Sequence, residues 1–192
     1  MTELILTREH ALALSRQRFA FFARGGMRSL LPDTPILWNW HLDLIASRLE
    51  DAMEGRTRRL IINIPPRYGK SLMSSVMLPA FVLGRRPSAE VVCASYAFEL
   101  AERMANDTRR LMNSMFYREV FGPRLVSPVA RLSDLRTYQG GCRFATSVEG
   151  TMTGRGGNLI IIDDPLKPNQ ADSETQRLAV NSKRGRDPTL RA

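Results

Sequence analysis

The tripeptide Gly69-Lys70-Ser71 combines residue types that handle phosphate. A lysine can reach the terminal phosphates of a nucleotide, and a serine hydroxyl can coordinate Mg²⁺. Backbone N–H groups of a tight loop and of the following helix point into one concavity and attract a polyphosphate. We therefore predict a nucleotide-binding loop made of six consecutive residues: Pro66, Arg67, Tyr68, Gly69, Lys70 and Ser71.

Such a loop needs a strand before it and a helix after it. The β-branched apolar run over 59–64 predicts a buried strand, and an apolar helical pattern follows Ser71. Ile64 stands where the pattern G-x-x-x-x-G-K-[ST] has its first glycine, so only the second half of the pattern fits. An ordinary strand–turn–helix also explains this stretch when it is taken alone.

A second motif lies at residues 158–165, where four consecutive aliphatic residues precede Asp163 and Asp164. This run predicts a strand buried on both faces, with its carboxylates at the end where open α/β sheets bind ligands. Asp163 would hold Mg²⁺, together with Ser71, and Asp164 would orient or deprotonate the attacking water. A buried strand ending in an Asx turn is the alternative. Together and in this order, the two motifs indicate a nucleoside triphosphatase that uses ATP and Mg²⁺.

Other candidate residues flank these motifs. Trp40 and His41 precede the loop and offer an aromatic face and a hydrogen-bonding edge to adenine, or they anchor a helix to the core. Arg155 lies on a glycine-rich loop at 150–157. It would act as a phosphate sensor or as an arginine finger toward a neighbouring subunit, or it is a solvated arginine on a flexible loop. Arg67 is the competing candidate and would act within its own subunit.

The composition sets wider bounds. A net charge of +9, mostly from arginine, favours a polyanionic partner such as nucleic acid or the nucleotide, although a generically basic protein has the same charge. The sequence contains no run of 18 apolar residues and no signal-peptide pattern, so we expect no membrane association. Cys93 and Cys142 lie in apolar segments and predict buried, reduced thiols and no metal site.

The remaining pattern predicts an alternating α/β order. We expect helices over 7–23, 41–53, 97–113 and from Ser71 to about Leu83, and strands over 90–95 and 142–147. Gly25-Gly26 should end the first helix, Gly84 with Pro87 should close the helix after the loop, and Pro79 should kink or shorten it. Residues 117–140 should form an irregular surface excursion, and residues 183–192 should form a frayed basic end.

The loop at 61–71 closely resembles the P-loop of the large terminase subunit of tailed bacteriophages, which commonly reads Pro-Pro-Arg-His-Gly-Lys-Ser. Tyr68 replaces the frequent histidine, and Trp40-His41 resembles the family's adenine-binding lead-in. The resemblance covers about residues 35–180. Three further stretches match in order and spacing: Ala94-Ser95-Tyr96, Thr153-Gly154-Arg155-Gly156 and Ile161-Ile162-Asp163-Asp164-Pro165.

The resemblance implies a P-loop NTPase of the ASCE type, with a mainly parallel sheet flanked by helices. It implies an ATP-driven motor that packages double-stranded viral DNA into a procapsid in the cytoplasm of a bacterial host. The implied partners are double-stranded DNA, the small terminase subunit and the portal protein. A ring homo-oligomer is implied for a full-length chain only.

The resemblance also predicts three regions: a helical lead-in at 1–54, a P-loop ATPase core at 55–170, and a polar basic tail at 171–192. A full large terminase continues into a coupling motif and a nuclease domain, which nothing here matches, and the departure begins near Ser182. Truncation, a frameshift or a split gene would each leave the fold C-terminally incomplete in this way. A catalytically silent fragment that binds nucleotide or partners therefore remains an alternative, as does, more distantly, a helicase-like or kinase-like P-loop enzyme.

Overall fold

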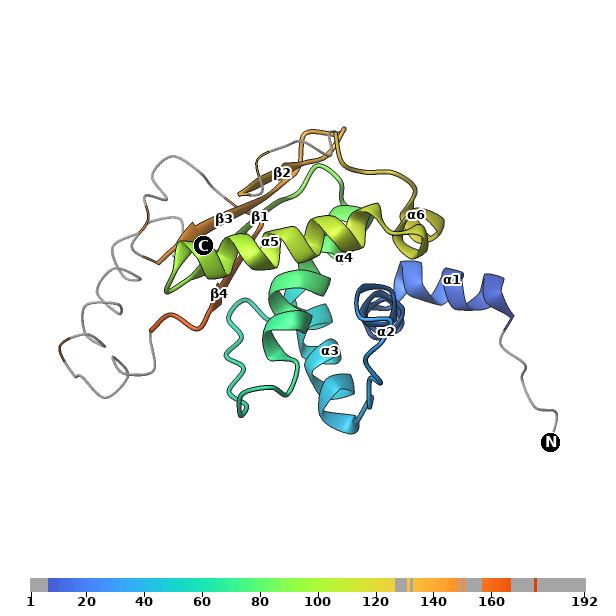
Figure 1. Ribbon diagram of the computed structural model, residues 1–192, viewed down its shortest axis with the longest axis horizontal. Coiled ribbons are helices and arrows are strands. Elements are labelled where there is room, and N and C mark those ends of the chain that lie inside the picture. Colours follow the sequence, from blue (N-terminus) through green and yellow to red (C-terminus); the bar gives the residue numbers. More distant parts are fainter. Residues whose placement is uncertain are drawn as a thin grey trace.

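The computed structural model describes residues 7–126, 131, 133–148, 150, 157–166 and 175 (Figure 1). Three helices come first, followed by a π-helix, η1, that continues directly into α4. The elements in chain order are α1 (Arg8–Gln17), α2 (Phe19–Leu30), α3 (Trp40–Met53), η1 (Leu72–Met77), α4 (Leu78–Arg85), β1 (Glu90–Ser95), α5 (Phe98–Asn113), α6 (Met115–Phe121), β2 (Asp134–Arg136), β3 (Cys142–Ser147) and β4 (Leu159–Asp163).

The sheet has four strands in the order β2-β3-β1-β4. β1 pairs in parallel with β3 on one side and with β4 on the other, whereas β2 is antiparallel to β3. Helix α5 connects β1 toward β3 and packs on both strands (Figure 1). This is the mixed α/β architecture with a mostly parallel, helix-flanked sheet that the sequence predicted.

The register of the sheet places three polar residues at one level at its carboxyl edge. Ser95 of β1 lies opposite Ser147 of β3 and opposite Asp163 of β4. Because paired residues of parallel strands point to the same face, these side chains share a face of the sheet. Arg143 lies two pairs earlier along that face, beside Val91. The face is the one that η1 and α5 cover.

One hydrophobic core joins the N-terminal helices to the sheet, and it runs across the predicted boundary at residue 54. Phe19 and Phe22 of α2 are fully buried and pack on the ring of Phe81 in α4, at ring-centroid distances of 5.4 and 5.2 Å. Tyr117 and Phe121 of α6 extend the same aromatic cluster. Burial of these large side chains holds α2, α4 and α6 together.

The predicted strand at 59–64 does not form. Leu60, Ile62 and Ile64 pack against the core while Ile61 is 89% exposed, so the segment keeps the alternation of an extended chain. However, its backbone N–H and C=O groups make no backbone hydrogen bond within the described part of the chain. A strand forms only where a neighbouring strand pairs with its backbone, and β4 is the edge strand on that side of the sheet within the described residues. The expected unit of strand 59–64, helix and β1 is therefore absent.

The prediction that Gly25-Gly26 ends the first helix is wrong. Helix α1 ends at Gln17, and α2 runs through both glycines to Leu30. A Cβ on Gly26 would lie 2.8 Å from the sulfur of Met77, and one on Gly25 would overlap the ring of Phe116. The glycines are needed for close packing of α2 on its neighbours, a tertiary cause that outweighs their low helix propensity.

Gly84 likewise lies inside α4 rather than closing it, since α4 ends at Arg85. The predicted interruption at Pro79 is present as a change from π-helix to α-helix, with the proline in the first turn of α4. The irregular excursion predicted for 117–140 is wrong in part. It contains α6, which is N-capped by the Ser114 side chain, and the short strand β2.

The other predicted elements are confirmed. The helix predicted at 41–53 is α3, the helix predicted at 97–113 is α5, and the strands at 90–95, 142–147 and 159–163 are β1, β3 and β4. Cys93 and Cys142 are buried. Residues 151–156 and most of 167–192, with the predicted basic tail, lie outside the described residues. No helix in the described ranges is long and apolar enough to cross a bilayer.

Candidate functional site

The loop before η1 has an unusual backbone. Arg67 and Gly69 both have positive φ angles, 70° and 83°. The N–H groups of Arg67, Tyr68 and Gly69 donate to no acceptor in the described part of the chain. Residues in left-handed conformations next to right-handed ones turn successive N–H groups into one concavity that suits an anion. Free donors followed by a helix N-terminus are what phosphate binding requires.

Lys70 joins this loop to the carboxyl end of β4, although the two segments are 94 residues apart in sequence. Its Nζ donates to Asp164 Oδ1 at 2.5 Å and lies 3.5 Å from Asp163 Oδ1. Burial lowers the pKa of the Lys70 ammonium, but the hydrogen bond to Asp164 and the two carboxylate charges outweigh burial, so its pKa is raised above the ordinary value. Lys70 is therefore a fixed cation at this edge of the sheet.

The two aspartates differ in environment. Asp163 is the last residue of β4 and is 4% exposed, whereas the side chain of Asp164 is 48% exposed. Asp164 has φ 45°, a left-handed conformation that aspartate tolerates better than most residues, and its carbonyl accepts from the N–H of Tyr96. The turn after β4 thus directs one carboxylate inward and leaves the other accessible, as a metal ligand and a water-activating group would require.

Ser75 is a candidate that the sequence analysis missed. Its hydroxyl donates to Asp163 Oδ2 at 3.2 Å, and both residues are buried. Ser71, the predicted metal ligand, is partly buried at the start of the helix, and no hydrogen bond links it to Asp163 in the described structure. The sequence did contain a signal for Ser75: its hydroxyl follows Ser71 by one helical turn, on the side of the helix that faces the sheet.

The donor set fits Mg²⁺. One inward carboxylate with a neighbouring hydroxyl suits a hard cation that keeps several waters and takes its other ligands from phosphate. Within the described residues there is no group of three His, Cys, Asp or Glu side chains that would form an all-protein metal cage. Asp163 and Ser71 would hold the ion, with Ser75 orienting the carboxylate.

The predicted adenine-binding residues meet the loop in space. The rings of Trp40 and His41 are edge-to-face at 6.2 Å, and those of His41 and Tyr68 are edge-to-face at 5.6 Å. Trp40 is 71% exposed and Tyr68 is 53% exposed, so their faces remain accessible. Leu42 of α3 lies under Gly69, where a Cβ would approach it to 3.2 Å. The start of α3 therefore lies against the candidate phosphate loop.

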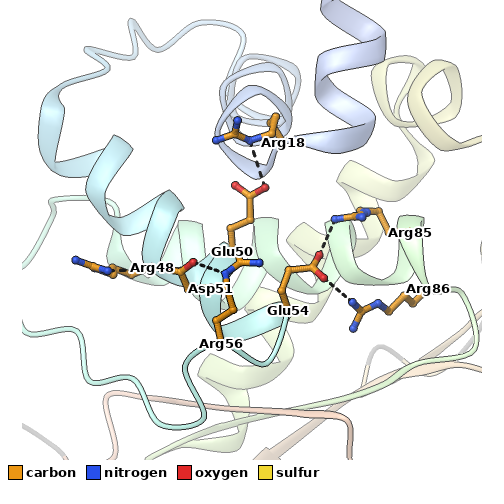
Figure 2. A network of polar contacts seen from close by, with 8 residues as sticks. All are labelled: Arg18, Arg48, Glu50, Asp51, Glu54, Arg56, Arg85 and Arg86. Carbon is orange, nitrogen blue, oxygen red and sulfur yellow. Dashed lines mark hydrogen bonds and ion pairs between the residues drawn. The ribbon is translucent and has the colours of Figure 1, made fainter.

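A network of ion pairs fixes the other end of α3 (Figure 2). Glu54 accepts from Arg85 at 2.8 Å and from Arg86 at 2.9 Å, both from the end of α4 and its cap. Glu50 pairs with Arg18 at 3.4 Å. Acidic groups near a helix C-terminus oppose its dipole, so the arginines neutralise an unfavourable arrangement while linking α3 to the segments around it.

The two arginine candidates have different outcomes. Arg67 lies in the loop, exposed, with no ion-pair partner in the described part of the chain. Arg155 lies outside the described residues, so its assignment stays a prediction.

We compared the chain with models of known protein families and with curated proteins, and no significant match was found in either comparison.

Proposed function

We propose that this chain is a P-loop ATPase, the ATP-hydrolysing part of a large terminase subunit that packages double-stranded viral DNA. The single observation that carries the nucleotide site is the meeting of Lys70 with Asp163 and Asp164. This ion pair places a lysine that follows a glycine loop beside two carboxylates at a strand end, an arrangement that suits a shared phosphate and Mg²⁺. When nucleotide is bound, phosphate would replace the carboxylates as the partner of Lys70. Mg²⁺ would then replace Lys70 as the partner of Asp163.

The proposed chemistry is in-line attack of water on the terminal phosphate of ATP. The loop N–H groups and Lys70 bind the phosphates, Asp163 and Ser71 hold Mg²⁺, and Asp164 orients the water and accepts its proton. Trp40, His41 and Tyr68 contact adenine. A bound Mg²⁺ would neutralise phosphate charge, and the chain would position the substrate and the water.

Replacement of the lysine tests the site. Lys70→Ala should abolish detectable Mg·ATP binding or turnover, because the phosphates lose their fixed cation, and the fold should persist because Lys70 is not part of the core. Arg103→Ala is a matched control, since Arg103 is an exposed cation on α5. Calorimetric ATP titration and phosphate release measure both variants. Equal ATP affinity and hydrolysis in Lys70→Ala and the parent chain would overturn the assignment.

A second candidate function is nucleotide binding without hydrolysis. It is favoured by the direct bond between Lys70 and Asp164, which keeps the candidate water-activating carboxylate engaged. It is also favoured by the absence of a sheet partner for 59–64 within the described residues. Measuring ATP binding and turnover in the same preparation, with and without double-stranded DNA, separates the two. Binding with no turnover under either condition would identify the silent form.

The DNA-packaging part of the proposal depends on the resemblance of the motifs and on the net charge of +9. A positively charged chain is attracted to the duplex backbone without reading sequence. The small terminase subunit and the portal protein are the proposed protein partners, and a ring of full-length subunits is the proposed assembly.

A further inference from the structure

Arg143 is a cation in the interior of the protein. It lies on β3, is fully buried, and donates from Nη2 to the carbonyl of Ser75 at 3.2 Å and from Nη1 to the carbonyl of Ala101 at 3.4 Å. No carboxylate pairs with it in the described structure, and its Nε has no hydrogen-bond partner there. Burial lowers the pKa of the guanidinium. Burying a guanidinium charge without a carboxylate partner costs free energy, so the two hydrogen bonds of Arg143 call for a structural explanation.

The explanation involves Pro79, which has no backbone N–H. In an α-helix, the carbonyl of Ser75 would accept the N–H of the residue four positions later, which is Pro79 and has no N–H. In the π-helical register the carbonyl of Ser74 loses the same donor. The chain is a π-helix over Leu72–Met77, with the N–H of Leu78 bonded to the carbonyl of Met73. At the change from the π-helix to α4, the α-helical donor of the Ser75 carbonyl would be Pro79, and Arg143 supplies a donor to that carbonyl instead.

The same serine faces the candidate site. While its carbonyl is held by Arg143, the hydroxyl of Ser75 donates to Asp163 Oδ2. The other oxygen of that carboxylate lies 3.5 Å from Lys70 Nζ. A continuous series of contacts thus runs from β3 through the π-helix to the metal-binding carboxylate. π-Helical turns are rare and frequently occur at functional sites.

We infer that Arg143 is a positioning residue for the nucleotide site: it replaces the missing N–H of Pro79 at the Ser75 carbonyl and so holds the π-turn that orients Asp163. This inference rests on the proposed function where it concerns Asp163 as a metal ligand. The bond between Arg143 and the turn is a separate claim about the fold. The two claims therefore need separate measurements.

The first measurement is a double-mutant cycle in the full 192-residue chain. Arg143→Met removes both donors at similar size, and Pro79→Ala restores an N–H to the helix. The effect of Arg143→Met alone has no fixed sign, because removing a buried cation offsets the lost bonds. In the Pro79→Ala background, Arg143→Met should destabilise the chain less, or stabilise it more, than it does in the parent chain. The expected coupling is about tenfold to a hundredfold in the unfolding equilibrium constant, which is the range for one hydrogen bond from a charged donor.

Denaturant unfolding of the four chains gives this coupling. Additive effects of the two substitutions would overturn the claim that Arg143 replaces the proline's donor. If Arg143→Met does not fold, recovery of folding in the double variant supports the claim. Failure of the double variant to fold, although Pro79→Ala restores the N–H, overturns the claim.

The second measurement is the Mg²⁺ dependence of binding of a fluorescent ATP analogue. Arg143→Met should raise the Mg²⁺ concentration for half-maximal binding several-fold, Ser75→Ala should do the same, and the Pro79→Ala/Arg143→Met double variant should recover the parent value. A purely structural role would lower the bound fraction without moving the Mg²⁺ midpoint, and this result overturns the positioning role. If the parent chain binds no nucleotide, the proposed function fails and the positioning role with it, while the unfolding cycle still decides the bond to Ser75.

Discussion

Arg67 and Asp164 have the only positive φ angles among the non-glycine residues that the structure describes. Each such conformation costs on the order of 1–3 kcal/mol, and it persists where the surroundings impose it. One residue belongs to the candidate phosphate loop, and the other follows the strand that carries the candidate metal ligand. Their coincidence at one edge of the sheet is independent of the motif match, and it supports a site there.

At this scale the first prediction separates the two aspartates. Asp164→Asn should keep Mg·ATP binding and reduce hydrolysis by about 10²–10⁴-fold, because it removes the proton acceptor while asparagine tolerates the left-handed backbone. Asp163→Asn should damage both binding and hydrolysis, since the buried carboxylate contacts Ser75 and lies beside Lys70. Single-turnover kinetics and equilibrium binding measure the two. Hydrolysis at the parental rate by Asp164→Asn would refute its role as the base.

A second residue-scale prediction uses the two neighbouring tryptophans. Trp40→Ala should weaken ATP binding by about 1–3 kcal/mol, the range for base–aromatic stacking, with little change in stability because its ring is exposed. Trp38 is the matched control. Its Nε1 donates to Asp43 and its ring lies under Arg24, so Trp38→Ala should lower the unfolding temperature and leave ATP affinity unchanged. The reverse pattern would remove Trp40 from the site.

At the scale of elements, glycines determine how closely the helices pack. A Cβ on Gly84 of α4 would overlap the ring of Phe121 in α6. Gly84→Ala should lower the free energy of unfolding by about 1–3 kcal/mol through overpacking, although alanine is the better helix former by about 1 kcal/mol.

Chemical denaturation measures this change. Ser29→Ala, at an exposed position of α2, is the control and should stay within about 0.5 kcal/mol of the parent. A more stable Gly84→Ala chain would show that helix propensity outweighs the contact with Phe121.

At the scale of the whole molecule, the excess positive charge is not spread evenly. Around the C-terminal end of α3, five arginines already face acidic partners (Figure 2): Arg18, Arg48, Arg56, Arg85 and Arg86. Exposed pairs of this kind contribute little stability each, but they reduce the local positive field.

The corresponding prediction concerns salt. Binding to double-stranded DNA should be insensitive to sequence, and its affinity should fall linearly in a log–log plot against salt, with a slope of about −0.9 for each phosphate contact. Fluorescence anisotropy with two unrelated duplexes across a salt series measures both properties. Tight binding that survives high salt, or a marked preference for one duplex, would contradict backbone recognition.

Local patterns determined much of this protein. The apolar stripe of α3, the clean amphipathic pattern of α5 and the aliphatic runs of β1 and β4 were readable because each repeats with the period of its own element. The two motifs were readable as chemistry because Lys70, Asp163 and Asp164 are residue types that phosphate and metal require. Lys70 lies 2.5 Å from Asp164 and 3.5 Å from Asp163, although the strand predicted to carry its loop to the sheet does not form.

Only the tertiary structure decided the rest. Residues 59–64 have the composition of a strand, yet a strand depends on a neighbour that the segment itself does not encode. Gly25-Gly26 has the composition of a helix end, yet contacts with Met77 and Phe116 require glycine within the helix. The bond from buried Arg143 to Ser75, in the turn that Pro79 interrupts, joins residues 68 positions apart. Hydrogen bonds and close packing between distant segments have no local periodicity, so no sequence pattern predicts them.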